Sequence, residues 1–394
     1  MSFPAALPIP EPILEIARTL EGAGFEAWCV GGTLRDTLLG HPQSDYDIAT
    51  SAAPEQVQAL FPKTIGVGIK YGTVGVLDRK RELHEVTTFR KDVATDGRHA
   101  VVAYGVALED DLARRDFTIN AIAYHPLRRE WRDPFDGARD LDSRLVRAVG
   151  DPAQRFREDY LRILRALRFA ARFDFSIDPQ TWEAARAAAP GLARLSAERV
   201  RDEWFKSLRT ARSLAQLVSL WKEVGAAGVW LPELAAGVDT ANVPDQALRD
   251  RDPVLLTAWL CSNPVAVLKR LKASNAEVDR ARGIEKGPEG PSGRDERSVR
   301  RWLAQTGESA DDLSALWSLR HGDAPPWDEI VRKIRGRGDA LTRSDLAVSG
   351  SDLEALGASG PRIGQLLAEL LERVLEDPAL NTRDRLLDLA RKMG

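Results

Sequence analysis

The apolar pattern of this 394-residue chain changes its period near residue 151. Before that point, short strand-like runs alternate with short helical segments, whereas after it apolar residues recur only at helical spacing. This change predicts an α+β fold, in which a small mixed sheet is followed by helices alone. The chain is also too long for one ordinary core. We therefore expect a head over residues 1–150, a helical neck over 151–210, a helical body over 211–340 and a helical tail over 341–394.

The head carries separate strand and helix signals. Residues 27–30 form a short apolar run, and residues 46–49 are the next strand candidate. Residues 72–77 and 83–88 alternate apolar and polar residues as the strands of a hairpin do. Residues 54–61 begin with a proline and an acid, which is typical of a helix N-terminus. We expect a small mixed sheet with helices packed on one side.

Residues 30–50 combine two glycines with a D-x-D pattern. Gly31 and Gly32 let the backbone approach phosphate groups without a side-chain clash. Asp45 and Asp47 lie two residues apart, so on a strand their carboxylates share one face. Adjacent carboxylates repel unless a hard cation such as Mg²⁺ lies between them. The segment predicts metal-assisted phosphoryl or nucleotidyl transfer, and a turn followed by a solvated acidic strand end is the alternative.

A third carboxylate is expected from the predicted hairpin. Glu85 lies on the candidate strand LHEVTTFR, beside which the D-x-D strand would lie. In that position it would act as a metal ligand or hold the metal site together. An ordinary exposed strand glutamate explains the sequence equally well, so both interpretations stay open.

The segment RRDFTINA, residues 114–121, offers groups that hold a nucleotide. The guanidinium of Arg115 can form charge-assisted, bidentate bonds to phosphate oxygens. Asp116 and Asn120 can hold a ribose hydroxyl. Taken alone the pattern is weak, because R-R-D also occurs at the exposed start of many helices.

A predicted helix over residues 156–173 contains the second strong signal. Asp159, Arg162, Arg165 and Arg168 recur every three residues and form one polar stripe. Cytosine and adenine each place an amine donor beside a ring-nitrogen acceptor, so a carboxylate with a guanidinium would accept them and reject uracil and guanine. We expect Asp159 and Arg162 to read the base, and the next two arginines to meet phosphates. Ion pairs on a solvated helix face are the alternative.

Composition and charge add weaker constraints. The formal net charge is only −3, so the overall charge does not indicate a nucleic-acid partner. A local basic stripe is compatible with this net charge. Cys29 and Cys261 are the two cysteines and lie in apolar stretches, as free thiols in a reducing compartment do. We see no signal peptide and no membrane span. These features predict a cytoplasmic protein with no membrane association, and they imply no protein partner.

Several motifs together resemble the bacterial tRNA nucleotidyltransferase and poly(A) polymerase family. In chain order they are GGTLRDTLLG, DYDIAT, HEVTTFR, DLARRDFTINAIAY, DPFDGARDL and EDYLRILRALRFAARF. The resemblance is dense over the first half, and the end of the chain, SGSDLEALGASGPRIGQLLAELLERVL, is similar to the family's tail. It implies a catalytic head, a nucleotide-reading neck and a helical body and tail that bind tRNA, with CTP and ATP as substrates.

The resemblance also implies roles for individual residues. Asp45 and Asp47 would hold two Mg²⁺ ions, whereas Gly32 and Arg35 would meet the triphosphate. The remaining candidates would hold the nucleotide: Arg115, Asp116, Asp159, Arg162, Arg165 and Arg168. The expected reaction is addition of C, C and A to the 3′ end of tRNA.

One segment departs from the family pattern. Residues 91–105 read KDVATDGRHAVVAYG and keep Asp96 and Arg98, but His99 and Ala100 stand where the family often has a proline. Because the resemblance assigns this loop to the switch from C to A addition, enzymes that add only CC or only A stay open as alternatives. So do a bacterial poly(A) polymerase and a catalytically silent RNA-binding protein.

A basic, glycine-broken segment lies in the predicted body. Arg332, Lys333, Arg335 and Arg337 can contact RNA phosphates, and the neighbouring glycines would permit close approach. A solvated basic loop is the alternative.

Overall fold

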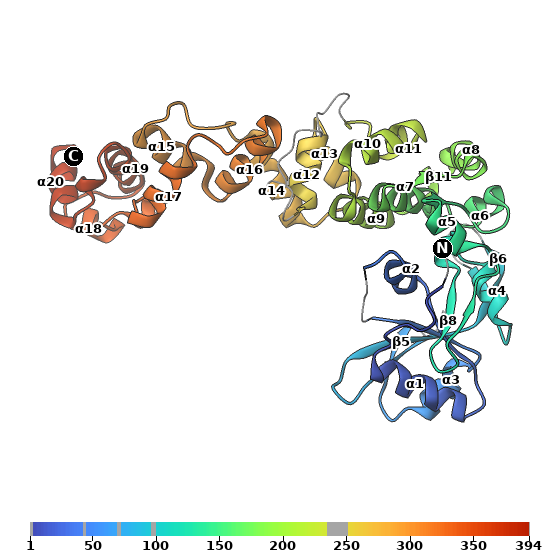
Figure 1. Ribbon diagram of the computed structural model, residues 1–394. Helices are drawn as coiled ribbons and strands as arrows, with labels where there is room; N and C mark the ends of the chain where they lie inside the picture. The colour runs from blue at the N-terminus through green and yellow to red at the C-terminus, as the bar shows by residue number, and fades with distance from the viewer. Residues whose placement is uncertain (1–2, 42–44, 69–71, 96–99, 235–250, 394) are drawn as a thin grey trace. The chain divides into compact units, whose positions relative to one another are not determined.

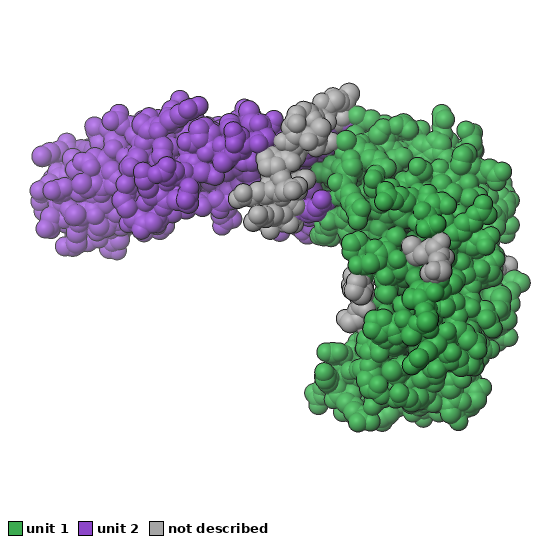
Figure 2. Space-filling model, viewed as in Figure 1, with its two compact units in different colours: residues 1–232 green, residues 233–394 purple. Residues whose placement is uncertain are grey.

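The structure is a computed structural model that describes residues 3–41, 45–68, 72–95, 100–234 and 251–393 (Figure 1). The chain forms two compact units, residues 1–232 and residues 233–394 (Figure 2). The finer division into head, neck, body and tail stays a prediction.

The first unit contains the predicted small mixed sheet. Over the described residues its strand order is β3-β4-β5-β2-β1-β8-β9, in which β2 and β5 pair in parallel and the other neighbours pair antiparallel. The strands are β1 (Ala27–Val30), β2 (Asp47–Thr50), β3 (Thr64–Gly68), β4 (Thr73–Leu77), β5 (Leu83–Thr88), β8 (Ala123–His125) and β9 (Glu130–Arg132). Two short ribbons accompany the sheet: β6 (Arg90–Thr95) with β7 (Ala100–Tyr104), and β10 (Leu145–Val146) with β11 (Ser176–Ile177).

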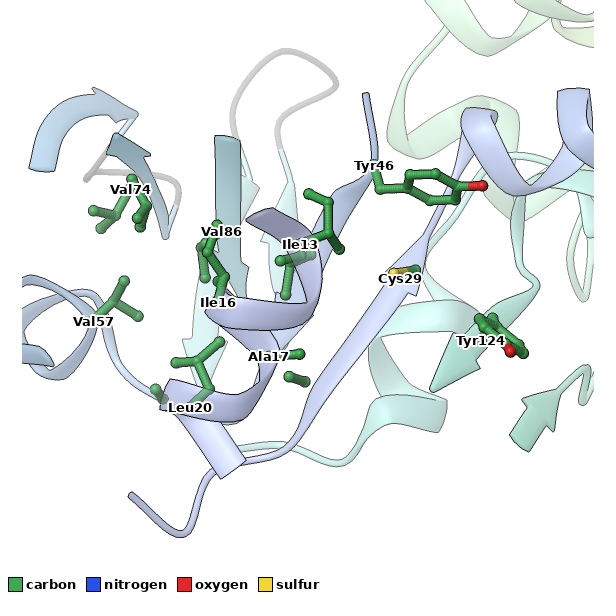
Figure 3. Close-up of a cluster of buried hydrophobic side chains, with 14 of the residues drawn as sticks. Ile13, Ile16, Ala17, Leu20, Cys29, Tyr46, Val57, Val74, Val86 and Tyr124 are labelled. Atoms are coloured by element: carbon green, nitrogen blue, oxygen red, sulfur yellow. The ribbon is translucent and has the colours of Figure 1, made fainter. Parts of the chain in front are cut away.

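One face of the sheet packs against α1 (Glu11–Gly22) and α3 (Pro54–Leu60). On α1, Ile13 and Leu20 lie one full heptad apart, so they point to the same side, and both are buried against Val74 and Val86 of the sheet (Figure 3). This apolar layer fixes the strands that carry the candidate carboxylates.

The opposite face of the sheet is also covered, so the expectation of helices on one side only is wrong. Trp28 and Val30 of β1 pack in one cluster with Leu108 and Leu112 of α4 (Leu108–Ala113). The physical reason is the sequence AWCV of β1, which is apolar without alternation and is buried at every position. A continuous apolar run is typical of a strand covered on both faces.

The predicted single helix over residues 156–173 is two helices, α6 (Pro152–Glu158) and α7 (Leu161–Phe173). Asp159 has an extended backbone, with φ −154° and ψ 105°, and its Oδ1 accepts a hydrogen bond from the Leu161 N–H at 3.0 Å. This bond satisfies a backbone donor at the start of α7. Asp159 therefore lies before the arginine-bearing helix rather than in its stripe.

The other helical segments of the first unit complete its core. They are α2 (Gly32–Leu38), η2 (Thr118–Asn120), α5 (Gly137–Asp142), α8 (Pro179–Ala188), η3 (Ala189–Arg194), α9 (Ala197–Thr210), α10 (Leu214–Glu223) and α11 (Ala226–Trp230). The rings of Trp204 in α9 and Trp221 in α10 meet edge to face, with centroids 5.0 Å apart.

The second unit is helical over its described residues, as predicted. Its helices are α12 (Pro253–Leu260), α13 (Pro264–Arg270), α14 (Asn275–Lys286), α15 (Glu296–Thr306), α16 (Ala310–His321), α17 (Asp328–Arg337), α18 (Gly350–Glu354), α19 (Pro361–Glu376) and α20 (Arg383–Met393), with the 3₁₀ turns η4 (Gly307–Ser309), η5 (Arg343–Asp345) and η6 (Pro378–Leu380). Within the described part of the chain, no helix has both the length and the apolar character needed to cross a membrane.

A tight contact in the first unit yields a stability prediction. A Cβ added at Gly137 would lie 2.3 Å from the backbone oxygen of Thr118, in the η2 turn. Because backbone must move to relieve that clash, we expect Gly137→Ala to lower the free energy of unfolding by about 1–3 kcal/mol. The measurement is the unfolding midpoint in a denaturant titration. Gly22→Ala is the matched control, since its Cβ would meet nothing within 4 Å, and equal midpoints for the two variants would contradict the prediction.

Candidate active site

A cavity of about 510 Å³ in the first unit brings the predicted site residues together. It is lined by all of the predicted nucleotide-binding residues, which are Gly32, Arg35, Arg115, Asp116, Asn120, Asp159, Arg162, Arg165 and Arg168. Gly31, Asp47, Arg114, Leu161, Phe169, Arg172 and Arg199 complete the lining. Motifs that lie more than 100 residues apart in the sequence therefore share one concave surface, as ligand sites usually do.

The predicted carboxylates meet at one end of the parallel strand pair. Ile48 of β2 is opposite Val86 of β5, so the preceding residues Asp47 and Glu85 are also neighbours. The pKa of Asp47 is raised to about 6, chiefly by loss of surrounding water and also by the negative charges of Glu85 and Asp45, whereas Arg115 opposes the shift. The strand begins at Asp47, so Asp45 lies just before it rather than on it.

These carboxylates fit a divalent metal by their chemistry. Asp45, Asp47 and Glu85 offer only oxygen donors, which Mg²⁺ prefers. Their mutual repulsion is visible in the raised pKa of Asp47, and a bound cation would relieve it. Enzymes that transfer nucleotidyl groups take a divalent metal at such a cluster.

Gly31 has φ 85°, a backbone conformation that favours glycine. A Cβ at this position would lie 3.3 Å from Nη1 of Arg115 and 3.5 Å from Oδ2 of Asp47. The missing side chain keeps the space between this arginine and this carboxylate open.

Asp116 is a buried carboxylate at the floor of the cavity. Nε and Nη2 of Arg165 both lie 2.7 Å from its Oδ2, and its Oδ1 accepts from Nδ2 of Asn120 and from the Phe117 N–H, each at 2.9 Å. Burial alone would raise the pKa of Asp116, but the Arg165 guanidinium and these hydrogen bonds lower it to about 2. The group is therefore ionised whenever the protein is folded near neutral pH.

Arg35 is more deeply buried than its predicted contact with a triphosphate suggests. Its guanidinium lies 4.8 Å from the ring centres of both Phe169 and Phe173, and it donates to Asp36 at 2.8 Å and to Oδ1 of Asn120 at 2.5 Å. Burial lowers the pKa of Arg35, and Asp36 opposes that shift. Contact of Arg35 with the triphosphate stays a prediction, and its observed contacts hold α2 against α7.

The two predicted base-reading groups are held by separate partners. Nη2 of Arg199 lies 2.7 Å from Oδ2 of Asp159. Arg162 donates to Oε2 of Glu158 at 2.8 Å and to the backbone oxygen of Arg114 at 2.9 Å. Both side chains line the cavity, and their role in reading a base stays a prediction.

Sequence reasoning missed several acids and arginines that hold the site. Buried Glu203 lies 2.7 Å from Nε of Arg168 and 3.8 Å from Nη1 of Arg165, and Arg172 lies 2.8 Å from Asp36. A signal was present, because Arg199 and Glu203 lie four residues apart and share one face of α9. Without the fold, that pair is indistinguishable from an exposed helix pair.

The candidate RNA-binding residues in the second unit lie on a helix, so the alternative of a solvated basic loop is wrong there. Arg332, Lys333, Arg335 and Arg337 belong to α17, which ends at Gly338 with φ 67°. Ion pairs join Lys333 to Glu329, Arg335 to Asp311, and Arg337 to Glu296 and Asp339. Their contact with RNA stays a prediction.

The departure from the family pattern cannot be followed in space, since Asp96, Arg98 and His99 lie outside the described residues.

A mixed-sheet head whose clustered carboxylates lie beside an arginine-lined cavity defines a nucleotidyltransferase. The profile of the family described as "Poly A polymerase head domain" matches residues 27–147, and that of "Probable RNA and SrmB- binding site of polymerase A" matches residues 174–237. The chain is 36% identical to the CCA-adding enzyme of Streptococcus mutans over 99% of its length and 97% of that protein. The chain belongs to the family of CCA-adding enzymes.

Solved structures agree with this assignment. The CCA-adding enzyme of Bacillus stearothermophilus in complex with CTP has a TM-score of 0.81 and 34% sequence identity, with 97% of each chain covered. The Thermotoga maritima CCA-adding enzyme complexed with tRNA_CCA has a TM-score of 0.67 at 19% identity, covering 97% of this chain and 94% of that one, and supports the fold alone.

The Asp116–Arg165 pair yields a pH prediction. The pKa of Asp116 is about 2 in the folded state and near 3.9 when unfolded. Ionised Asp116 therefore adds its full contribution to the free energy of unfolding above pH 4, and this contribution is lost as the pH falls through about 2. That contribution is about 2 kcal/mol. We expect Asp116→Asn to be less stable than the parent protein at pH 7, with a gap that narrows between pH 4 and pH 2, in denaturant titrations across that range.

Asp202→Asn is the control for this experiment, because Asp202 is exposed and lies beside Arg201 on the surface of α9. If the difference in free energy of unfolding between the parent protein and Asp116→Asn stays constant down to pH 2, the low pKa assigned to Asp116 is wrong.

Proposed function

We propose that this chain adds C, C and A to the 3′ end of tRNA, using CTP and ATP and releasing pyrophosphate, without a nucleic-acid template. The observation that carries the proposal is that one cavity contains both the phosphate-side motifs of the head and the Asp159–Arg162 pair. A cavity that contained only the phosphate-side motifs would suit any phosphoryl transferase. The relatives named CCA-adding enzymes support the same reaction.

Mg²⁺ is the proposed metal, with Asp45 and Asp47 as its ligands and Glu85 beside them. When bound, it supplies charge stabilisation at the oxygens of the reacting phosphate and lowers the pKa of the attacking hydroxyl. In the overall reaction the tRNA 3′ oxygen bonds to the α-phosphorus, the bond to pyrophosphate breaks and the hydroxyl proton is released. Asp47 lines this end of the cavity, beside the space that Gly31 leaves open.

Base choice is proposed to come from Asp159 and Arg162. The Asp159 carboxylate would accept the exocyclic amine of cytosine or adenine, and the Arg162 guanidinium would donate to the adjacent ring nitrogen. Uracil and guanine would place a carbonyl oxygen against the carboxylate, which has no proton to donate. Arg199 and Glu158 hold the two readers and prevent them from turning toward each other.

The phosphates and ribose of the nucleotide are assigned to the opposite side of the cavity. Arg115 lies next to Asp47 and has a guanidinium directed into the same space, which suits a phosphate. Arg165 and Arg168 would support the nucleotide while paired with Asp116 and Glu203. Asn120 would meet the ribose beside Asp116.

The helical parts are proposed to bind tRNA by shape rather than sequence. In this proposal residues 1–150 catalyse, residues 151–210 read the nucleotide, and residues 211–340 and 341–394 hold the RNA, with the basic face of α17 as one contact. We propose the cytoplasm as the place of action. Cys29 and Cys261 support it, because both are free and buried, and burial raises the pKa of both thiols.

The direct test offers the purified protein a tRNA that ends before CCA, with CTP alone, ATP alone, or both. We expect growth by two residues with CTP and by a third when ATP is added, resolved on a sequencing gel. A stop after CC, addition of A only to a tRNA ending in CC, or an unlimited A tail would each replace the proposal with the corresponding rival enzyme.

Asp45→Ala is the control that separates catalysis from RNA binding. We expect it to abolish extension while tRNA binding persists in a filter-binding assay. An extension-free parent protein that still binds tRNA would favour the silent RNA-binding alternative.

The base-reading assignment predicts a change of specificity. Asp159→Ala should degrade the preference for CTP and ATP over UTP and GTP more than it slows turnover, because the variant loses the acceptor for the exocyclic amine. The measurement is kcat/KM for each of the four nucleotides, with Asp202→Ala on the surface of α9 as the matched control. If the four nucleotides keep their original ranking and ratios in Asp159→Ala, the assignment is wrong.

A further inference from the structure

The hairpin that joins β4 to β5 contains a second cluster of metal-ligating side chains. The cluster consists of Asp78, Glu82 and His84. Each residue offers one ligand atom, and these three atoms lie within 4.8 Å of one another. The strands fix this geometry, because Leu77 pairs with Leu83 and the turn closes between Asp78 and Glu82. The cluster is separate from the carboxylates assigned to catalysis.

His84 is the observation that points to a ligand. The residue is only 7% exposed, and neither ring nitrogen has a hydrogen-bond partner among the described residues. Its Nε2 lies 3.5 Å from Oδ2 of Asp78, which is long for a hydrogen bond. A buried imidazole whose nitrogens make no hydrogen bond is costly, and a bound group would supply the missing partner.

Asp78 is held so that one oxygen is available to the same space. Its Oδ1 accepts from the backbone N–H groups of Lys80 and Glu82, each at 2.8 Å. Its Oδ2 is buried and has no hydrogen-bond partner in the described structure. The carboxylate is thus fixed by the turn through one oxygen, and the other is directed at His84.

The distances suit two ligands of one metal ion. With metal–nitrogen and metal–oxygen bonds of about 2.0–2.2 Å, two tetrahedral ligands lie about 3.4 Å apart. The 3.5 Å between His84 and Asp78 matches this value without movement. Glu82 is exposed, so its carboxylate is free to rotate into the third position.

We propose that Asp78, Glu82 and His84 bind one transition-metal dication of the Zn²⁺ class, with water completing the coordination. One imidazole and two carboxylates form a donor set known for Zn²⁺, whereas Mg²⁺ prefers oxygen ligands alone. The positive charge of the nearby Arg79 is offset by Glu15, at 3.1 Å. The proposal does not depend on the catalytic assignment.

The site would act on the hairpin rather than in the reaction. Successive residues of a strand point to opposite faces, so His84 and its neighbour Glu85 lie on different sides of β5. The Zn²⁺-class ion would therefore join the two ends of the turn on the face away from Asp47. It would fix the start of the strand that carries Glu85.

The test titrates Zn²⁺ into the full, chelator-stripped chain by calorimetry, with Mg²⁺ in large excess. We expect one Zn²⁺ per chain, retained in Asp47→Ala. Loss of groups that only orient a ligand weakens metal sites about 10–100-fold, so loss of a ligand in Glu82→Gln should weaken binding by at least about tenfold. His84→Gln should abolish it, and the exposed His321→Gln serves as the matched control with unchanged binding.

Three outcomes would overturn the proposal: no Zn²⁺ bound under excess Mg²⁺, parental affinity in both Glu82→Gln and His84→Gln, or loss of the bound ion in Asp47→Ala. Glu82 is exposed, so its variant keeps the test decisive even if the His84 variant does not fold. Parental affinity in all variants would leave His84 and Asp78 as a simple ion pair.

Discussion

The contact between Asp116 and Arg165 is the interaction on which the site depends. It joins the segment after α4 to α7, and Asp116 also orients Asn120, which in turn accepts from Arg35. A buried carboxylate is stable only when its oxygens are paired. Here each oxygen has partners, so the floor of the cavity is one connected polar network rather than a set of separate side chains.

Paired charges explain how one small cavity tolerates so many arginines. Arg35 and Arg172 share Asp36, Arg168 binds Glu203, and each of these acids is buried. The acids offset the repulsion between neighbouring guanidinium groups and hold them in place before any ligand arrives. A nucleotide bound as proposed would meet donors whose positions are already fixed, which would reduce the entropy lost on binding.

Much of this arrangement could be predicted because the signals are local. The strand around Asp47 and the hairpin around Glu85 follow from alternation and turn residues, whereas the parallel pairing of β2 with β5 is seen only in the structure. The break at Asp159 was missed, since a single side-chain hydrogen bond to the Leu161 N–H ends one helix and starts the next. Glu203 was missed because its partners lie 35 or more residues away in the sequence, and only tertiary packing shows which acids are buried.

Arg35 has a consequence for how the cavity measures its ligand. Its guanidinium lies against two phenylalanine rings of α7 while its backbone belongs to the helix that follows the glycine turn. The glycine turn and α7 are therefore held together by one stacked side chain, so the span from Gly31 to Arg162 of α7 has a set length. In the proposed function this fixed span would act as a ruler, because a nucleotide whose base is held at Arg162 would have its reacting phosphorus placed at the carboxylates.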